Sequence, residues 1–187
     1  MPPRKVIVFA QVSRALRKSP FWSSFKEKVE DHPRGMVVEI SSPSKNLDLI
    51  NETISNNLRR GELAVMLGIR KSTGKGDWSQ IRHFTPARHS ARLSQYLAGK
   101  LKVAPIPSTV TRFNAEYGPT DVERNREARE FVNIAFKSGW RAVPMVILPW
   151  FSDNPKQRES IENDTPNMEA FGAALADGCI AFIERWS

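Results

Sequence analysis

The chain has 187 residues, 40% of them hydrophobic, which is long enough to bury a complete core without disulfide or metal staples. Its single cysteine, Cys179, excludes an internal disulfide framework and any multi-cysteine zinc site, and the small apolar neighbours of this thiol indicate a core position. The formal charge of +8 and the pI near 9.9 favour anionic surroundings. The basic residues are dispersed, however, so the sequence favours a solvated basic surface over a nucleic-acid groove, which stays an alternative.

The first half of the chain alternates between strand-like and helix-like segments. Short runs rich in β-branched residues predict strands at 6–9, 36–41 and 63–69. Ser19 and Pro20 form a helix N-cap followed by proline, and the helix after them has an apolar stripe of Trp22, Phe25 and Val29. Asn46 precedes a second amphipathic helix, and the Lys-, Gly- and Ser-rich segment 70–80 is typical of an exposed loop.

The second half continues the alternation. Thr85 and Pro86 predict a helix start, segment 109–113 a strand, and Thr120 with Glu123 a capping box that opens the next helix. A strand at 142–148 and a final helix from Thr165 complete the pattern. This order predicts one α/β domain over residues 1–187, with a mostly parallel twisted sheet of about five strands and helices on both faces.

The last predicted strand and its turn, residues 143–155, resemble a known family. In zinc-dependent N-acetylmuramoyl-L-alanine amidases a Pro-Ala-Val-Leu-Val-Glu strand is followed by an aromatic residue and then by Asn-Pro. The matching residues here are Pro144, Val146, Ile147, Phe151, Asn154 and Pro155. Segments 35–43, 61–66, 92–102 and 173–178 are similar, in the same order, to other strands and helices of that family. The resemblance implies the family's α/β fold and a connection with peptidoglycan.

The groups that the resemblance implies for catalysis are missing at the matching positions. A catalytic zinc needs about three protein ligands, an open position for water and a nearby carboxylate. The family's glutamate falls on Leu148 or Pro149, and its two histidines fall on segment 10–13 and on Ser41. The carboxylates nearest the third ligand's position are Glu27 and Glu30. We therefore expect no metal and no cofactor, and favour a protein that is not an enzyme.

Two sets of side chains are candidates for a relocated active site. Strand alternation places Glu39 and Ser41 on one face of the second predicted strand, so Glu39 is a candidate general base with Ser41 nearby. The alternative is a glutamate at the end of the strand that is paired with an arginine. His83 and His89 are the candidate metal ligands. They straddle the predicted helix start among arginines, which favours a solvated or anion-facing cluster instead.

Candidate binding residues lie at loops and strand ends. Asp153 and Asn154 follow the last strand, at the sheet edge where ligands bind in such folds, although turn chemistry explains them equally well. Trp78 lies in the predicted exposed loop, and Arg82 and Arg88 flank the histidines.

The favoured hypothesis is a catalytically inactive amidase-like protein that binds peptidoglycan fragments or serves an assembly with other proteins. An active cell-wall hydrolase with a non-standard site and a basic nucleic-acid-binding module are the alternatives. The sequence contains neither a signal-peptide pattern nor a run of transmembrane length, so we expect a cytoplasmic or virion-associated protein, and a phage origin would fit.

Overall fold

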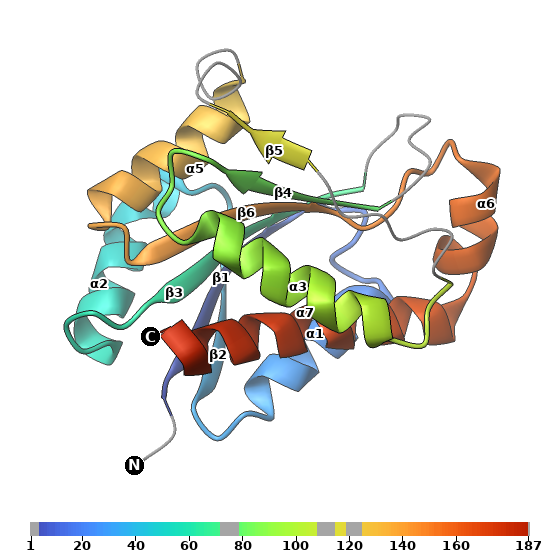
Figure 1. Ribbon diagram of the computed structural model, residues 1–187, viewed down its shortest axis with the longest axis horizontal. Coiled ribbons are helices and arrows are strands. Elements are labelled where there is room, and N and C mark those ends of the chain that lie inside the picture. The colour runs from blue at the N-terminus through green and yellow to red at the C-terminus, as the bar shows by residue number, and fades with distance from the viewer. Residues whose placement is uncertain (1–3, 72–78, 108–114, 119–124, 187) are drawn as a thin grey trace.

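A computed structural model describes residues 4–71, 79–107, 115–118 and 125–186 (Figure 1). Six strands form one sheet in the order β2-β1-β3-β6-β4-β5. Their bounds are β1 Val6–Val12, β2 Gly35–Glu39, β3 Ala64–Ile69, β4 Gln80–Phe84, β5 Ala115–Tyr117 and β6 Ala142–Leu148. Strands β1, β2, β3 and β6 are mutually parallel, whereas β4 runs antiparallel to β6 and parallel to β5. The predicted α/β class with a mostly parallel sheet is confirmed.

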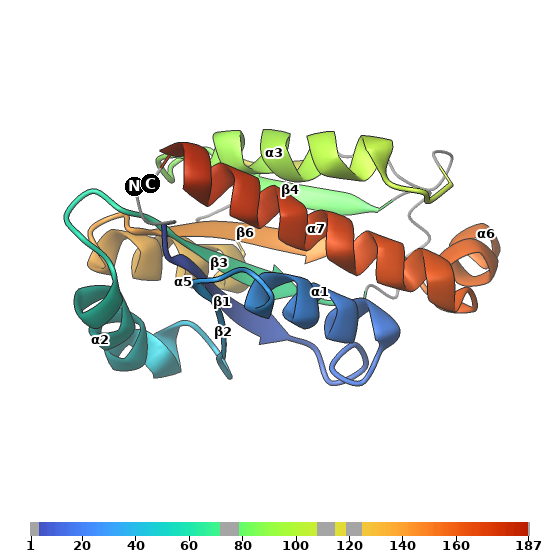
Figure 2. The same cartoon turned by 90° about the horizontal axis from the view of Figure 1, so that it is seen from below.

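Helices cover both faces of this sheet, as predicted. Figure 2 shows α1 (Pro20–Glu30), α3 (Ser90–Val103) and α7 (Thr165–Trp186) in front of the sheet and α5 (Arg126–Lys137) behind it. Helix α2 (Leu47–Asn57) packs into the same core as α5. Successive residues of β1 enter different cores: Val6 and Val8 pack under α1 and α7, whereas Ile7 and Phe9 pack under α2 and α5. A strand buried on both faces needs a continuous apolar run, which is why its sequence was recognisable.

The end of the β4–β6 ladder depends on a serine. Pro144 lies inside β6, opposite Met66 of β3, and has no N–H to donate. On its other side the hydroxyl of Ser90 accepts from the N–H of Phe84 at 3.0 Å and donates to the carbonyl of Pro144 at 2.7 Å. Ser90 is fully buried, so this hydroxyl satisfies two main-chain groups that water cannot reach.

The predicted helix start at Thr85 and Pro86 is wrong. These residues form a turn after β4, and α3 begins at Ser90, after His89 at a φ of 71°. Strand β4 was missed because its two buried apolar residues, Ile81 and Phe84, are three apart and enter different cores, which does not give the period of two typical of a strand.

The remaining helix predictions have mixed outcomes. The N-cap at Ser19 is confirmed, since its hydroxyl accepts from Trp22 N–H at 3.3 Å. Helix α5 is capped by Asn125, and the predicted start at 120 and the predicted strand at 109–113 lie outside the described residues.

Cys179 is buried, as predicted. Within the described part of the chain, no helix combines the length and the apolar character needed to cross a bilayer.

Candidate functional site

A polar cleft of about 550 Å³ lies where β1, β2 and β3 end. Strand β1 contributes Gln11, the segment after β2 contributes Ser42, Ser44 and Lys45, and Arg70 follows β3. The start of α5 forms the opposite wall with Asn125, Arg126, Glu127 and Glu130. Ligands in open α/β sheets bind outside the carboxyl ends of the strands, so this cleft is the candidate functional site.

Hydrogen bonds connect the ends of β1 and β2 at this cleft. The side-chain amide of Gln11 donates to the main-chain carbonyl of Ser41 at 3.2 Å. The N–H and the hydroxyl of Ser41 both donate to Oδ1 of Asn46, each at 3.0 Å. Ser41 stands where the amidase resemblance implies one histidine, and Gln11 lies in segment 10–13, where it implies the other. An amide and a hydroxyl are poor zinc ligands compared with imidazole or carboxylate, so this pair does not fit the metal.

Both carboxylates of the cleft have partners. Glu127 forms an ion pair with Arg70, with 2.7 Å between Oε2 and Nη2. Glu130 accepts from the N–H and the hydroxyl of Ser44 at 2.9 and 2.6 Å. Burial alone would raise the pKa of Glu130. The bonds from Ser44, a further bond from the Ser42 hydroxyl and the nearby charge of Arg126 all lower this pKa. Together they outweigh the effect of burial, so the pKa is lowered overall. A carboxylate with a lowered pKa is a weak general base, so Glu130 suits binding better than proton transfer.

The end of β6, where the family's glutamate would stand, is closed by apolar packing. Leu148 and Trp150 are each 2% exposed and Pro149 is buried. The Trp150 ring meets the ring of Phe21 from α1 edge to face, with centroids 5.8 Å apart. The candidate cleft therefore opens at β1, β2 and β3 and does not extend to the position of the missing acid.

Glu39 and Ser41 are not brought together on one face. Strand β2 ends at Glu39, so its alternation does not extend to Ser41, whose hydroxyl instead bonds Asn46 ahead of α2. Glu39 faces α1 and forms ion pairs with Lys26 of this helix at 3.1 Å and with Arg17, which precedes the helix, at 3.8 Å. It lines a separate groove of about 460 Å³, together with Glu27 and Glu30. The carboxylates near the third zinc-ligand position thus lie apart from Gln11 and Ser41.

The two candidate histidines lie away from the cleft. Strand β4 begins beside the carboxyl end of β6, where Gln80 pairs with Leu148. From there it runs antiparallel to β6, so His83 lies further from the carboxyl ends of the parallel strands. His89 follows the turn between β4 and α3. Burial lowers the pKa of His89, and the charges of Arg88 and Arg92 lower it further. Among residues 4–71, 79–107, 115–118 and 125–186, no group of three His, Cys, Asp or Glu side chains could hold a metal ion.

The candidate binding residues are also dispersed. Asn154 caps the short helix α6 (Pro155–Gln157), accepting from the N–H groups of Lys156 and Gln157 at 3.0 and 3.2 Å, and Asp153 beside it is exposed. Arg82 donates to the side chain of Gln80 at 2.8 Å, and Arg88 is exposed in the turn before α3. Trp78 lies outside the described residues.

Sequence reasoning missed most of the residues that line the cleft. Arg70 directly follows a strand and Ser42 to Lys45 follow another, so their positions at the sheet edge were a usable signal. Glu127 and Glu130 carried no such signal, because they lie on a helix and reach the cleft only through the packing of α5.

No family model matches the sequence, and no curated protein matches it significantly. Solved structures do match. An N-acetylmuramoyl-L-alanine amidase from Nostoc punctiforme aligns with 98% of this chain and 99% of its own, with a TM-score of 0.56 at 10% identity. The fold is that of the amidases. The amidase resemblance is thereby confirmed at the level of the fold.

Two further matches limit what this fold implies. A metallo-carboxypeptidase from Burkholderia cenocepacia has a TM-score of 0.56 at 10% identity; the match covers all of this chain but only 58% of the carboxypeptidase. A purine nucleoside phosphorylase from Toxoplasma gondii has a TM-score of 0.51 at 10% identity, over 98% of this chain and 93% of its own. Related architectures thus occur in proteins with different names and reactions, so the fold alone does not determine the reaction.

Proposed function

We propose that this protein is an amidase-fold protein without amidase catalysis, whose cleft at the ends of β1, β2 and β3 binds a glycan–peptide fragment of peptidoglycan. The observation that carries the proposal is the hydrogen bond from the Gln11 amide to the Ser41 carbonyl. Ser41 stands where the resemblance implies one histidine, and Gln11 lies in segment 10–13, where it implies the other. Neither group can hold Zn²⁺ tightly or generate a hydroxide from its water.

The charges of the cleft support a peptide-containing ligand. Lys45, Arg70 and Arg126 can bind carboxylates, while Glu127 and Glu130 can accept from an amine. A peptidoglycan stem peptide carries groups of both signs, whereas a nucleic-acid backbone carries only anions. The mixed lining therefore favours the peptide ligand over the nucleic-acid alternative.

Metal content and turnover test the absence of catalysis. The purified full chain, incubated with Zn²⁺ and desalted, is expected to retain substoichiometric zinc by mass spectrometry and to release no peptide from muropeptides. An active amidase from the same family serves as the positive control. Stoichiometric zinc together with cleavage would replace the proposal with an active hydrolase that uses a non-standard site.

Calorimetric titration with a muramyl tripeptide tests the binding. Arg70→Ala is expected to weaken binding about tenfold, because one charge-assisted contact contributes roughly 1–2 kcal/mol. Arg60→Ala is the matched control, since Arg60 is exposed and does not line the cleft. No binding by the unmodified chain, or equal losses in both variants, would count against this cleft.

A further inference from the structure

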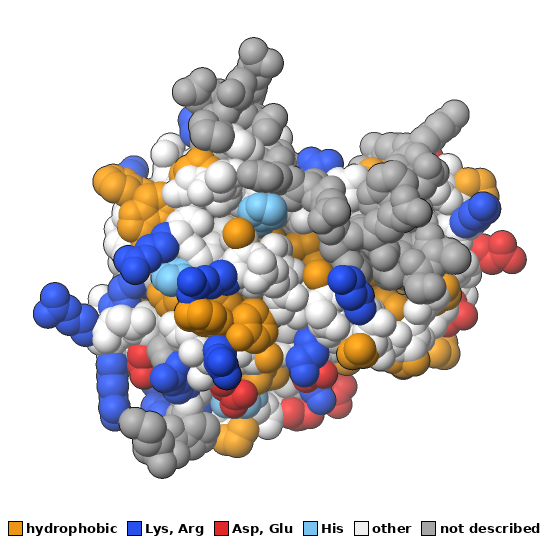
Figure 3. Space-filling view, viewed as in Figure 1, with side chains coloured by type: hydrophobic (Ala, Val, Ile, Leu, Met, Phe, Trp, Pro, Cys, Tyr) orange, Lys and Arg blue, Asp and Glu red, His pale blue; other side chains and the backbone are white. Residues whose placement is uncertain are grey.

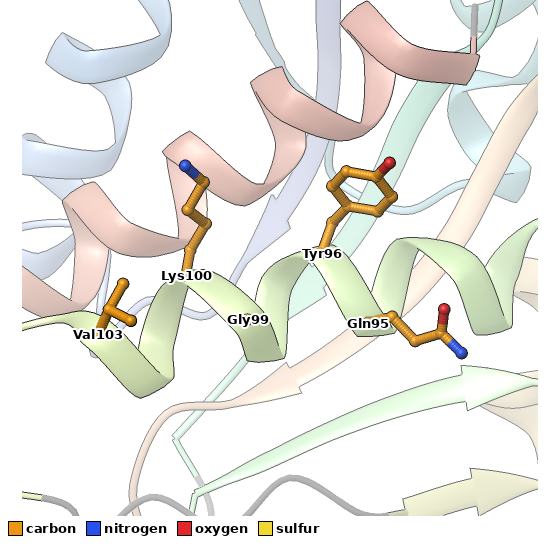
Figure 4. Close-up of a pocket in the computed structure, with 5 residues that line it drawn as sticks. All are labelled: Gln95, Tyr96, Gly99, Lys100 and Val103. Atoms are coloured by element: carbon orange, nitrogen blue, oxygen red, sulfur yellow. The ribbon is translucent and has the colours of Figure 1, made fainter.

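The outer face of α3 carries a mainly apolar groove, remote from the cleft, with a volume of about 380 Å³. It is lined by Gln95, Tyr96, Gly99, Lys100 and Val103 (Figure 4). Tyr96 and Lys100 rise from α3 toward α7, and Gly99 lies between them. A Cβ at Gly99 would meet nothing within 4 Å, so this glycine leaves a notch in the helix surface.

The apolar lining of the groove includes a highly exposed side chain. Val103 is 81% exposed, and it continues the stripe that Tyr96 and Gly99 begin, at helical spacing along one face of α3. Exposing apolar surface costs roughly 25 cal/mol per Å² relative to burying it, so a complex in which a partner covers this stripe would be stabilised.

One end of the groove is held in place by aromatic contacts. Trp186, at the end of α7, donates from Nε1 to the hydroxyl of Tyr96 at 3.0 Å. The guanidinium of Arg92 lies 3.9 Å from the centre of the Trp186 ring. Ordered Trp, Tyr and Arg side chains of this kind are the residues that contribute most to protein–protein binding.

The charged side chains of α3 have one sign. Helix α3 carries the basic residues Arg92, Lys100 and Lys102 and no acidic residue over its whole length. In the last turn of α7, Arg185 adds a further positive charge, and the neighbouring Glu184 is paired with His32. Figure 3 shows hydrophobic and basic side chains interspersed over this part of the molecule, with acidic side chains beside some of the basic ones. An occupant should therefore combine an apolar surface with acidic flanks.

We propose that this groove is the docking site for an amphipathic helix of a partner protein, with an apolar stripe bordered by acidic residues. The stripe packs on Tyr96 and Val103, one side chain enters the notch at Gly99, and the acids face Arg92 and Lys100. A second copy of the chain fits less well, because a two-fold contact would bring the basic α3 helices together. A bilayer fits less well because the feature is a notch and not a protrusion.

Titration of the full chain with two synthetic amphipathic helices tests the proposal. Both carry the same leucine face, and their polar faces are glutamate in one and lysine in the other. The glutamate peptide is expected to bind about tenfold tighter at low salt, with the difference shrinking as salt is added. Lys100→Glu should reduce this preference or reverse it.

A notch-filling variant separates docking from folding. Gly99→Leu is expected to fold, because the site faces open space, yet to weaken the glutamate peptide's binding about tenfold or more. Ala91→Leu is the control, being exposed on the same helix but outside the groove. Thermal unfolding of both variants checks that they are folded.

Several results would overturn the proposal. These are equal affinity for the two peptides, undiminished binding by Gly99→Leu, concentration-dependent dimerisation that Gly99→Leu abolishes, and binding to phosphatidylglycerol vesicles in place of the peptide. The third result would assign the groove to a second copy and the fourth to a membrane surface.

Discussion

The side-chain amide of Gln11 donates to the main-chain carbonyl of Ser41, with 3.2 Å between nitrogen and oxygen. The bond joins the ends of two neighbouring parallel strands, near the positions where the amidase resemblance implies metal ligands. Imidazoles introduced at these two positions would supply two metal ligands from adjacent strands.

The double substitution Gln11→His with Ser41→His is expected to give measurable but weak zinc binding and no muropeptide cleavage. Two ligands from adjacent strands can share one ion, but the third ligand and the proton-transferring acid remain missing, since Leu148 and Pro149 are buried. Competition with a chromogenic chelator measures the zinc affinity. Gln11→His alone is the control, and cleavage by the double variant would contradict the need for an acid after β6.

Glu130 is expected to make stability depend on pH in the acidic range. Its pKa is lower in the folded protein than in the unfolded chain, so the carboxylate contributes stability above the unfolded-state value, and the contribution is lost as pH falls through the folded-state pKa. Urea unfolding of the unmodified chain and of Glu130→Gln, from pH 7 down to about 3, measures this. The difference between them should be present at neutral pH and shrink toward the acid end; a constant difference would contradict the lowered pKa.

Ser90→Ala is expected to destabilise the fold by about 2 kcal/mol or more, because it leaves Phe84 N–H and the Pro144 carbonyl buried without the bridging hydroxyl. Ser94→Ala on the same helix is the matched control. Its hydroxyl bonds the carbonyl of Ala91 in an exposed setting, so the change should stay within about 0.5 kcal/mol. Urea unfolding measures both, and similar losses would show that the bridge does not stabilise the sheet.

Two glycines at α3 and α7 should respond in opposite directions to alanine. A Cβ at Gly178 would lie 2.8 Å from Cδ2 and 2.9 Å from Cα of Leu97, so Gly178→Ala is expected to cost about 1–3 kcal/mol through overpacking of the two helices. Gly99→Ala should stabilise by up to about 1 kcal/mol, because it removes a flexible residue from a helix without a new contact. Thermal midpoints measure both changes. A neutral Gly178→Ala would mean that α3 and α7 can shift enough to accommodate the added methyl group without loss of stability.

The sequence alone was sufficient for the elements whose signals are local. The run from Val6 to Phe9 indicated a strand buried on both faces, and Ser19 with Pro20 marked the start of α1 through a hydroxyl that bonds Trp22 N–H only three residues away. The alternation of such elements was enough to predict the class of fold, because short connections between strands and helices leave few arrangements.

The candidate site was decided by tertiary structure. Ser44 and Glu130 are 86 positions apart, and the carboxylate acquires its lowered pKa only when α5 packs beside the segment that follows β2. Strand β4 likewise depends on its neighbour β6 and on the buried hydroxyl of Ser90. Local patterns determine which segments become helices and strands, whereas the distances between distant side chains, and therefore the chemistry of the cleft, exist only once both faces of the sheet are covered.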